Sequence, residues 1–128
     1  PVGFDTCEFN EGELARLAGV TVNRVPLSEL FERAKAMAPY WSDAVHALRG
    51  RRHVVDLRAY GLVAGIELAS REGAIGARAY DALVAAFNAG LLIRITGDTI
   101  ALSPPLIVER KDVDRIFETL SGIIDRLD

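Results

Sequence analysis

The chain has 128 residues, of which half are hydrophobic and 26% are charged, so it can form one domain with a real core but not two. Its net charge of -3 argues against nucleic acids and anionic membranes as partners, because both attract basic surfaces. The one cysteine, Cys7, cannot form an internal disulfide, and no apolar run is long enough to cross a membrane. No signal peptide opens the chain, so we expect a cytoplasmic protein.

The first 26 residues differ from the rest, and we treat 1–26 as a divergent segment of its own. Its pattern predicts a short helix from Glu11 to Ala18, ended by Gly19, and then a short extended piece that stops at Pro26. The stretch 13–21 also looks like the first helix and turn of a helix-turn-helix DNA reader. Pro26 would break the recognition helix within about a turn and a half, and the chain is acidic, which disfavours this DNA-binding alternative.

From Leu27 onward, apolar residues recur at helical spacing and predict one amphipathic helix that stops before Gly50. The residues expected on its inward face are Leu27, Leu30, Phe31, Ala34, Ala38, Trp41, Val45 and Leu48. Pro39 lies inside this helix and removes one backbone donor, so we expect a kink or a one-turn break at 36–38.

The remaining pattern predicts strands at 53–57, 60–68, 91–95 and 99–102, and helices at 77–88 and 109–127. The turn between the last two strands carries Gly97 and Asp98, residue types that tight hairpins use. The helix at 77–88 is expected to turn inward Ala79, Tyr80, Leu83, Ala86 and Phe87. The last helix is expected to turn inward Val113, Ile116, Phe117, Leu120, Ile123, Ile124 and Leu127.

This order is helix-strand-strand-helix-strand-strand-helix. A single small, mainly antiparallel sheet with the helices packed on one face would bury every one of these apolar stripes. The predicted fold class is therefore α+β, a two-layer domain that spans 27–128.

No complete catalytic constellation can be assembled from the sequence. The two histidines, His46 and His53, have neither a nucleophile nor a carboxylate at a spacing that indicates a triad. One cysteine and two scattered histidines do not make a metal ligand set, and the glycines at 71–76 do not match a phosphate loop.

Arg94 is the exception, because it places one cation inside an otherwise apolar strand just before a tight turn. In one interpretation it pairs with a local carboxylate, such as Asp98, and stabilises the hairpin. In the other, its planar guanidinium binds the carboxylate of a small acid in bidentate fashion. From the residues alone, the first interpretation is favoured. The sequence Ser103-Pro104-Pro105-Leu106 is either a plain strand-to-helix connector or a rigid wall beside a pocket, and from the residues alone the connector is favoured.

Several motifs in order resemble the small C-terminal domain of class III aminotransferases, in the omega-amino-acid:pyruvate branch. The segments that carry the resemblance are 30–34, 38–41, 60–68, 76–80 and 90–106. That family consists of pyridoxal-phosphate enzymes of fold type I. The resemblance implies that Arg94 binds the substrate carboxylate and swings aside for an amine that lacks one. It also implies transfer of an amino group from a donor such as beta-alanine to pyruvate, through a lysine Schiff base with the cofactor.

The resemblance covers 27–127 and no large domain, and the chain begins with Pro1 instead of Met, so we expect a fragment of such an enzyme. Neither of its two lysines, Lys35 and Lys111, stands in a cofactor-lysine motif. We therefore expect no catalytic residue, no stable binding of pyridoxal phosphate and no activity of the isolated chain. The alternative is a non-catalytic interaction module that pairs with itself or with a full-length aminotransferase through exposed apolar surface.

Overall fold

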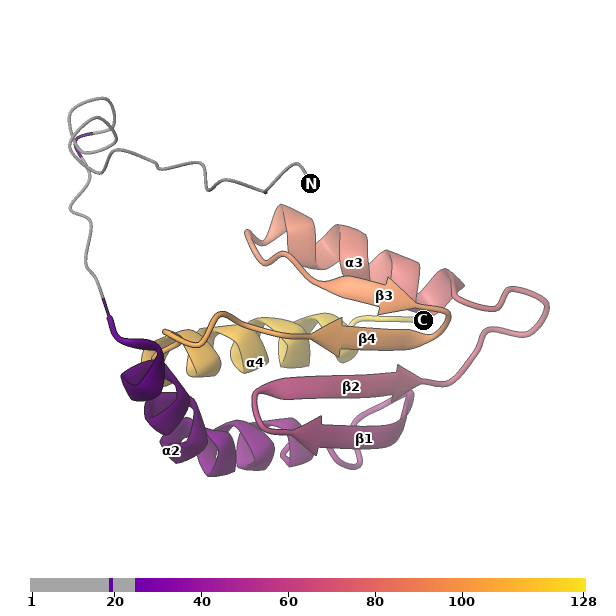
Figure 1. Cartoon of the computed structure of the whole chain (residues 1–128). Helices are drawn as coiled ribbons and strands as arrows, with labels where there is room; N and C mark the ends of the chain where they lie inside the picture. Colours follow the sequence, from indigo (N-terminus) through magenta and orange to yellow (C-terminus); the bar gives the residue numbers. More distant parts are fainter. Residues whose placement is uncertain (1–18, 20–24) are drawn as a thin grey trace, which may run out of the picture.

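The computed structural model describes residue 19 and residues 25–128. The elements in that part of the chain are α2 (Leu27–His46), β1 (Val54–Tyr60), β2 (Val63–Leu68), α3 (Ala77–Asn88), β3 (Arg94–Thr96), β4 (Thr99–Leu102) and α4 (Arg110–Ile124). Their order confirms the predicted succession of helices and strands (Figure 1). The short helix, the extended piece and the helix-turn-helix reading predicted for 11–25 fall outside the described residues, Gly19 and Val25 excepted. None of the described helices is long and apolar enough to span a bilayer.

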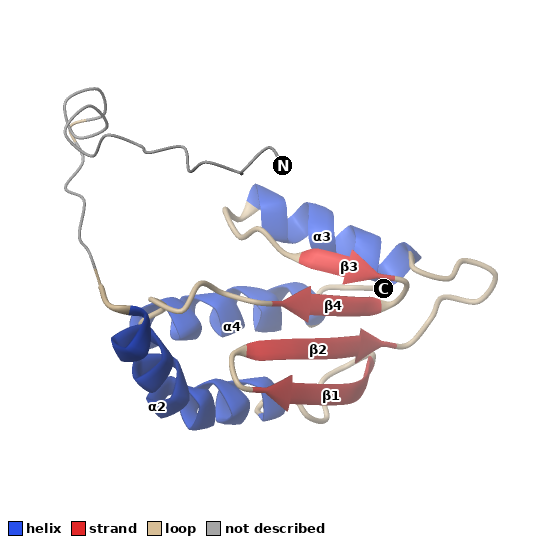
Figure 2. Cartoon of the chain, in the orientation of Figure 1, coloured by secondary structure: helices blue, strands red, loops and turns tan. Residues whose placement is uncertain are grey.

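The four strands form one antiparallel sheet in the order β1-β2-β4-β3, which leaves β1 and β3 at its edges. Side chains of a strand alternate between the two faces, and on the two central strands every second residue is buried. The buried residues of these strands are Ala64, Ile66, Leu68, Ile100 and Leu102. Figure 2 shows α4 behind the sheet, α2 at the end of the sheet with its last turns reaching behind β1, and α3 beside β3, while the face toward the viewer carries no described helix. We call this uncovered side the open face.

α2 continues through Pro39 without interruption, so of the two predicted outcomes at 36–38, a kink or a one-turn break, the break does not occur. Its ribbon does change direction between its two halves in Figure 1, as expected where a proline removes one backbone donor. Two residues predicted to face inward, Leu27 and Phe31, are 67% and 58% exposed. They lie in the first turns of α2, which extend past the ends of the strands in Figure 1.

The core lies between the sheet and the helices and is centred on Trp41, which is fully buried. The ring of Trp41 meets the ring of Phe117 on α4 edge to face, with 5.1 Å between centroids. α4 buries the face that the sequence predicts, except that Ile116 is only half-buried. α2 and α4 are thus joined to each other as well as to the sheet.

α3 carries two apolar stripes, and the structure buries the one made of small side chains. Ala79, Ala82 and Ala86 are fully buried, whereas Tyr80 and Phe87 are exposed, which corrects their predicted inward position. Small side chains let a helix approach its neighbours closely, so α3 packs against α4 and β3 through alanine methyl groups. Tyr80, Val84 and Phe87 point outward, whereas Leu83 is half-buried against the core, as predicted.

This arrangement predicts effects of very different size for two substitutions on α3. Ala82→Leu should lower the free energy of unfolding by about 1–3 kcal/mol, because added methyl groups would overpack the closed contact. Phe87→Ala should change it by less than about 0.5 kcal/mol, since that ring is already in solvent. Urea denaturation of the two variants beside the parent chain measures both values. A larger loss for Phe87→Ala than for Ala82→Leu would contradict the observed orientation of α3.

Candidate functional site

Arg94 is the first residue of the edge strand β3, and strand pairing places it on the open face. It pairs with Ala101 of β4, and Ala101 in turn pairs with Gly65 of β2, which pairs with Arg58 of β1. Because partners in register share a face of the sheet, these four residues form one row across the open face. The row has a guanidinium at each end and two small residues between them.

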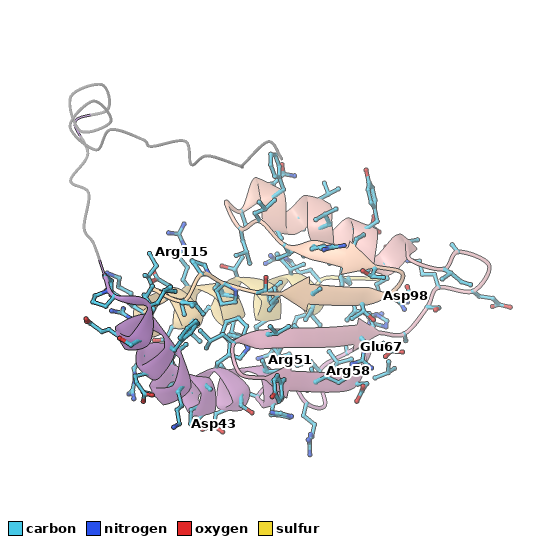
Figure 3. The ribbon with its side chains drawn as sticks, in the orientation of Figure 1. Asp43, Arg51, Arg58, Glu67, Asp98 and Arg115 are labelled. Atoms are coloured by element: carbon cyan, nitrogen blue, oxygen red, sulfur yellow. The ribbon has the colours of Figure 1, made fainter. Side chains whose placement is uncertain are left out.

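The guanidinium of Arg58 is already neutralised by carboxylates of the sheet. Its Nη1 donates to Oδ2 of Asp56 at 2.7 Å and to Oε2 of Glu67 at 3.0 Å. The side chain crosses Gly65, where an added Cβ would lie 3.5 Å from the Arg58 Nε. Figure 3 shows Arg58 and Glu67 together at this part of the sheet. Arg58 is therefore a structural cation that covers the small residue beneath it.

A third arginine, Arg78 on α3, also has partners for its guanidinium, but these are backbone oxygens and not carboxylates. Only 8% of its surface is exposed, and its guanidinium donates to the backbone carbonyl oxygens of Ala69 and Asp128. These bonds tie α3 to the end of β2 and to the segment after α4. No charge pattern in the sequence distinguishes Arg78 from a surface arginine, so sequence reasoning missed this role.

Arg94 differs from both, since it forms no ion pair or side-chain hydrogen bond with any other residue that the structure describes. The side chain is exposed on its edge strand. The local partner considered from the sequence, Asp98, is engaged elsewhere. Its carboxylate accepts hydrogen bonds from the hydroxyl of Ser70 and from the backbone N–H of Gly76, the latter at 2.8 Å. A stabilising pair between Arg94 and Asp98 is thus not formed.

These bonds of Asp98 fasten the β3–β4 turn, labelled by Asp98 in Figure 3, to the loop that leads into α3. The backbone carbonyl of Asp98 also accepts a hydrogen bond of 2.9 Å from the N–H of Leu68. Gly76 adopts a left-handed conformation with φ of 79°, and an added Cβ there would lie 3.4 Å from the carbonyl oxygen of Gly97. The turn that follows Arg94 is therefore held in place by contacts from two neighbouring segments.

A groove of about 440 Å³ lies beside Arg94, at the end of the sheet where β3 begins and β4 ends. Among the described residues Arg94 is its only charged lining residue, and Ser103 supplies a hydroxyl. The other lining residues are Trp41, Leu91, Leu92, Ile93, Ala101, Leu102, Pro104, Pro105 and Ile116. Both prolines of the segment read from the sequence as a connector thus form part of the wall. The helix residues Trp41 and Ile116 gave no sign of this role in the sequence.

The other candidate residues stand apart from the groove. His46 Nδ1 donates to the carbonyl oxygen of Ser42 at 2.7 Å, one turn earlier on α2. Burial, reinforced by the nearby charges of Arg78 and Arg52, lowers the pKa of His53 below its ordinary 6.5. Neither histidine lines the groove, and no cluster of potential metal ligands occurs in the described part of the chain. Cys7 lies outside the described residues.

The lysines do not provide a cofactor site either. Lys35 is exposed on α2, and Lys111 forms an ion pair of 2.7 Å with Glu109 at the start of α4. Neither residue lines the groove. The described residues therefore do not fit pyridoxal phosphate, which needs an amine to form a Schiff base and a set of donors for its phosphate.

Comparison with known sequences gives one consistent result. The profile of the family described as "Aminotransferase class-III" matches residues 15–124. Over 126 residues the chain is 50% identical to an omega-aminotransferase of Caulobacter vibrioides. The matched stretch covers 98% of this chain and 29% of that protein. The chain is 31% identical over 98 residues to an omega-amino acid--pyruvate aminotransferase of Pseudomonas putida, which covers 77% of this chain and 22% of that protein. The chain spans less than a third of the length of these relatives.

Solved structures agree with the sequence relatives. The omega transaminase from Pseudomonas jessenii in complex with PMP matches with a TM-score of 0.70 and 27% identity, over 77% of this chain and 23% of that one. An adenosylmethionine-8-amino-7-oxononanoate aminotransferase from Methanocaldococcus jannaschii has a TM-score of 0.71 at 24% identity and shares the fold, over 79% of this chain and 24% of that one. Both neighbours are fold type I transaminases, and the predicted α+β fold class is confirmed.

The hydrogen bonds of Asp98 predict that substitutions of Asp98 and of Arg94 change the free energy of unfolding independently of each other. Arg94→Gln should change the free energy of unfolding by less than about 0.5 kcal/mol, because the side chain has no described partner. Asp98→Ala should cost about 1–3 kcal/mol, because it leaves the Gly76 N–H and the Ser70 hydroxyl without their acceptor. A double-mutant cycle in urea should then give a coupling energy near zero. Coupling clearly above about 0.5 kcal/mol would mean that the two side chains pair after all.

His53 leads to a prediction about pH. Because its pKa is lowered in the folded chain, the unfolded chain binds more protons below the ordinary value of 6.5. Stability should therefore fall as the pH drops through this range, from about pH 7 toward about pH 5. His53→Asn should flatten that fall, and Asn tolerates the positive φ of 65° at this position. Urea midpoints measured across the range test this, and an unchanged slope in the variant would contradict it.

Proposed function

The chain belongs to the class-III aminotransferases, and on that premise we propose that it is the carboxylate-recognising part of an omega-aminotransferase. The proposed reaction moves an amino group from an omega-amino acid or an amine, such as beta-alanine, to pyruvate. One observation carries the proposal: Arg94 presents a guanidinium with no described partner beside an apolar groove, on a strand whose turn is fastened. The names of the relatives from Caulobacter and Pseudomonas support the substrate class.

In this proposal Arg94 binds and orients the acid, and takes no part in bond making. Its planar guanidinium can donate two parallel hydrogen bonds to a carboxylate, which fixes the direction of the acid as well as its position. The charge would act more strongly once the rest of the enzyme covers the open face and excludes water. The side chain stands at a sheet edge without a described partner, so it can swing aside for an amine that has no carboxylate.

The family depends on pyridoxal phosphate, and the residues that the structure describes do not fit the cofactor. The amine, the phosphate donors and the ring contacts would come from the two thirds or more of the enzyme that lie outside this chain. We therefore propose that the isolated chain is inactive. Mixed with pyridoxal phosphate, it should show no lasting visible absorbance of a protein-bound aldimine. A lasting band would contradict this.

A second candidate function is a docking module for the rest of an aminotransferase or for another copy of the chain. The observation that favours it is apolar surface without a described cover. On α3 the exposed residues Tyr80, Val84 and Phe87 follow one another at helical spacing. On the sheet, Tyr60 and Val63 pair with each other and are 90% and 55% exposed. Contiguous surface of this kind is typical of interaction sites. A monomer that persists on dilution in light scattering would count against self-pairing.

A chimeric enzyme tests the role of Arg94 directly. In the omega-aminotransferase of Caulobacter vibrioides, the segment that matches this chain would be replaced by residues 1–128. Arg94→Gln in this chimera should lower kcat/KM for pyruvate roughly 10- to 100-fold, because one charge-assisted bidentate contact is lost. The turnover of an amine donor without a carboxylate, measured at saturating pyruvate, should change far less.

Arg58→Gln is the matched control. Arg58 stands at the other end of the same row, but its charge is used by Asp56 and Glu67. It should leave the preference for pyruvate unchanged. If Arg94→Gln and Arg58→Gln lowered kcat/KM for pyruvate equally, carboxylate recognition by Arg94 would be refuted.

A further inference from the structure

The groove beside Arg94 has walls built almost entirely of carbon. It lies where residues 91–93 enter β3 and residues 103–105 leave β4, with Trp41 and Ile116 reaching it from the helices. Leu92 is 82% exposed here, so a large apolar side chain stands open at the site. A ligand that covered it would remove apolar surface from water, which is the main source of affinity in such sites.

The single positive charge among the described residues that line the groove favours a ligand with one negative charge. Arg94 lines the groove, and no carboxylate occurs among the described lining residues. A single anionic head can therefore be paired. A second charge, of either sign, on the part of the ligand that enters the groove would face apolar walls and lose its hydration without compensation. This disfavours dicarboxylates and amines and favours monocarboxylates.

The size of the groove indicates that the acid has more than a head. Cavities of 300–1,000 Å³ are typical of drug-sized ligands, and the groove has about 440 Å³. An acid as small as pyruvate would leave most of it uncovered. The Pro104-Pro105 wall is stiff, because proline fixes its backbone φ, so binding needs little reordering of this wall.

We propose that this groove binds the apolar tail of a monocarboxylate whose head is held by Arg94. The ligand class is an aliphatic or arylalkyl acid with a tail of about four to eight carbons, a size set by the groove. The proposal rests on the proposed function, because it uses the same guanidinium, and it deepens it. It assigns to this chain a share in substrate choice, since an acid with a tail is favoured over a short one.

A chain-length series tests the proposal on the 128-residue chain itself. Acetate, butanoate, hexanoate and octanoate are titrated below their micelle concentrations and followed by NMR. Affinity should rise roughly two- to four-fold per added methylene until the groove is filled. Hexylamine and hexanol, which share the tail but lack the anion, should bind at least about ten-fold more weakly than hexanoate.

Three variants separate the head from the tail. Arg94→Gln should weaken all acids by a similar factor. Leu92→Asn should flatten the rise with chain length while leaving acetate unchanged. Ile75→Asn is the matched control, because Ile75 is 83% exposed and does not line the groove, and it should change nothing. Both apolar residues lie in solvent, so neither change should unfold the chain.

The outcomes are distinct. Affinity that depends on Arg94 but not on chain length would overturn the proposal and leave carboxylate recognition intact. Equal binding of hexanol and hexanoate, or no binding of octanoate, would also overturn it. Failure of the function proposed for Arg94 is read separately, from pyruvate kinetics of the chimeric enzyme.

Discussion

The carboxylate of Asp98 decides how the candidate site is built. By accepting from Ser70 and Gly76 it joins the β3–β4 turn to the loop before α3, over 28 and 22 residues of sequence. The same bonds engage the local anion that the sequence suggested as a partner for Arg94. One side chain thus holds the edge strand in place, and the guanidinium on that strand has no partner among the residues that the structure describes. Both effects are needed if a flexible arginine is to recognise an acid from outside the chain.

The two faces of the sheet have different chemistry for a related reason. The covered face is filled by residues of the central strands and of the helices, so its composition is set by packing. On the open face, Gly65 and Ala101 lie between Arg58 and Arg94, and these small residues project little from the sheet. Arg58 lies over Gly65 with its charge satisfied, and Arg94 stands at the other edge with its charge available to an external anion. A single register therefore produces a neutral end and a cationic end.

The sequence predicted the order of elements because apolar residues recur at clear helical or strand spacing and because glycine and proline mark where elements end. The continuous apolar face of α4 is an example. Arg94 could be singled out because a cation stood inside an apolar strand. It could not be assigned a partner, since the bonds of Asp98 join residues far apart in the chain. α3 was oriented wrongly because its alanines and its aromatic residues both recur at helical spacing. Periodicity locates such stripes but does not choose between a close contact through methyl groups and a wider one through rings.

The groove itself was beyond sequence reasoning, since its walls come from α2, α4 and the two ends of the β3–β4 hairpin. Its floor includes Trp41, which is the only tryptophan of the chain and is fully shielded from solvent. The indole N–H of this residue has no hydrogen-bond partner within the described part of the chain. Indole fluorescence responds to the polarity around that ring. The protein therefore carries an intrinsic optical probe at the site, with no second emitter of the same kind to obscure its signal.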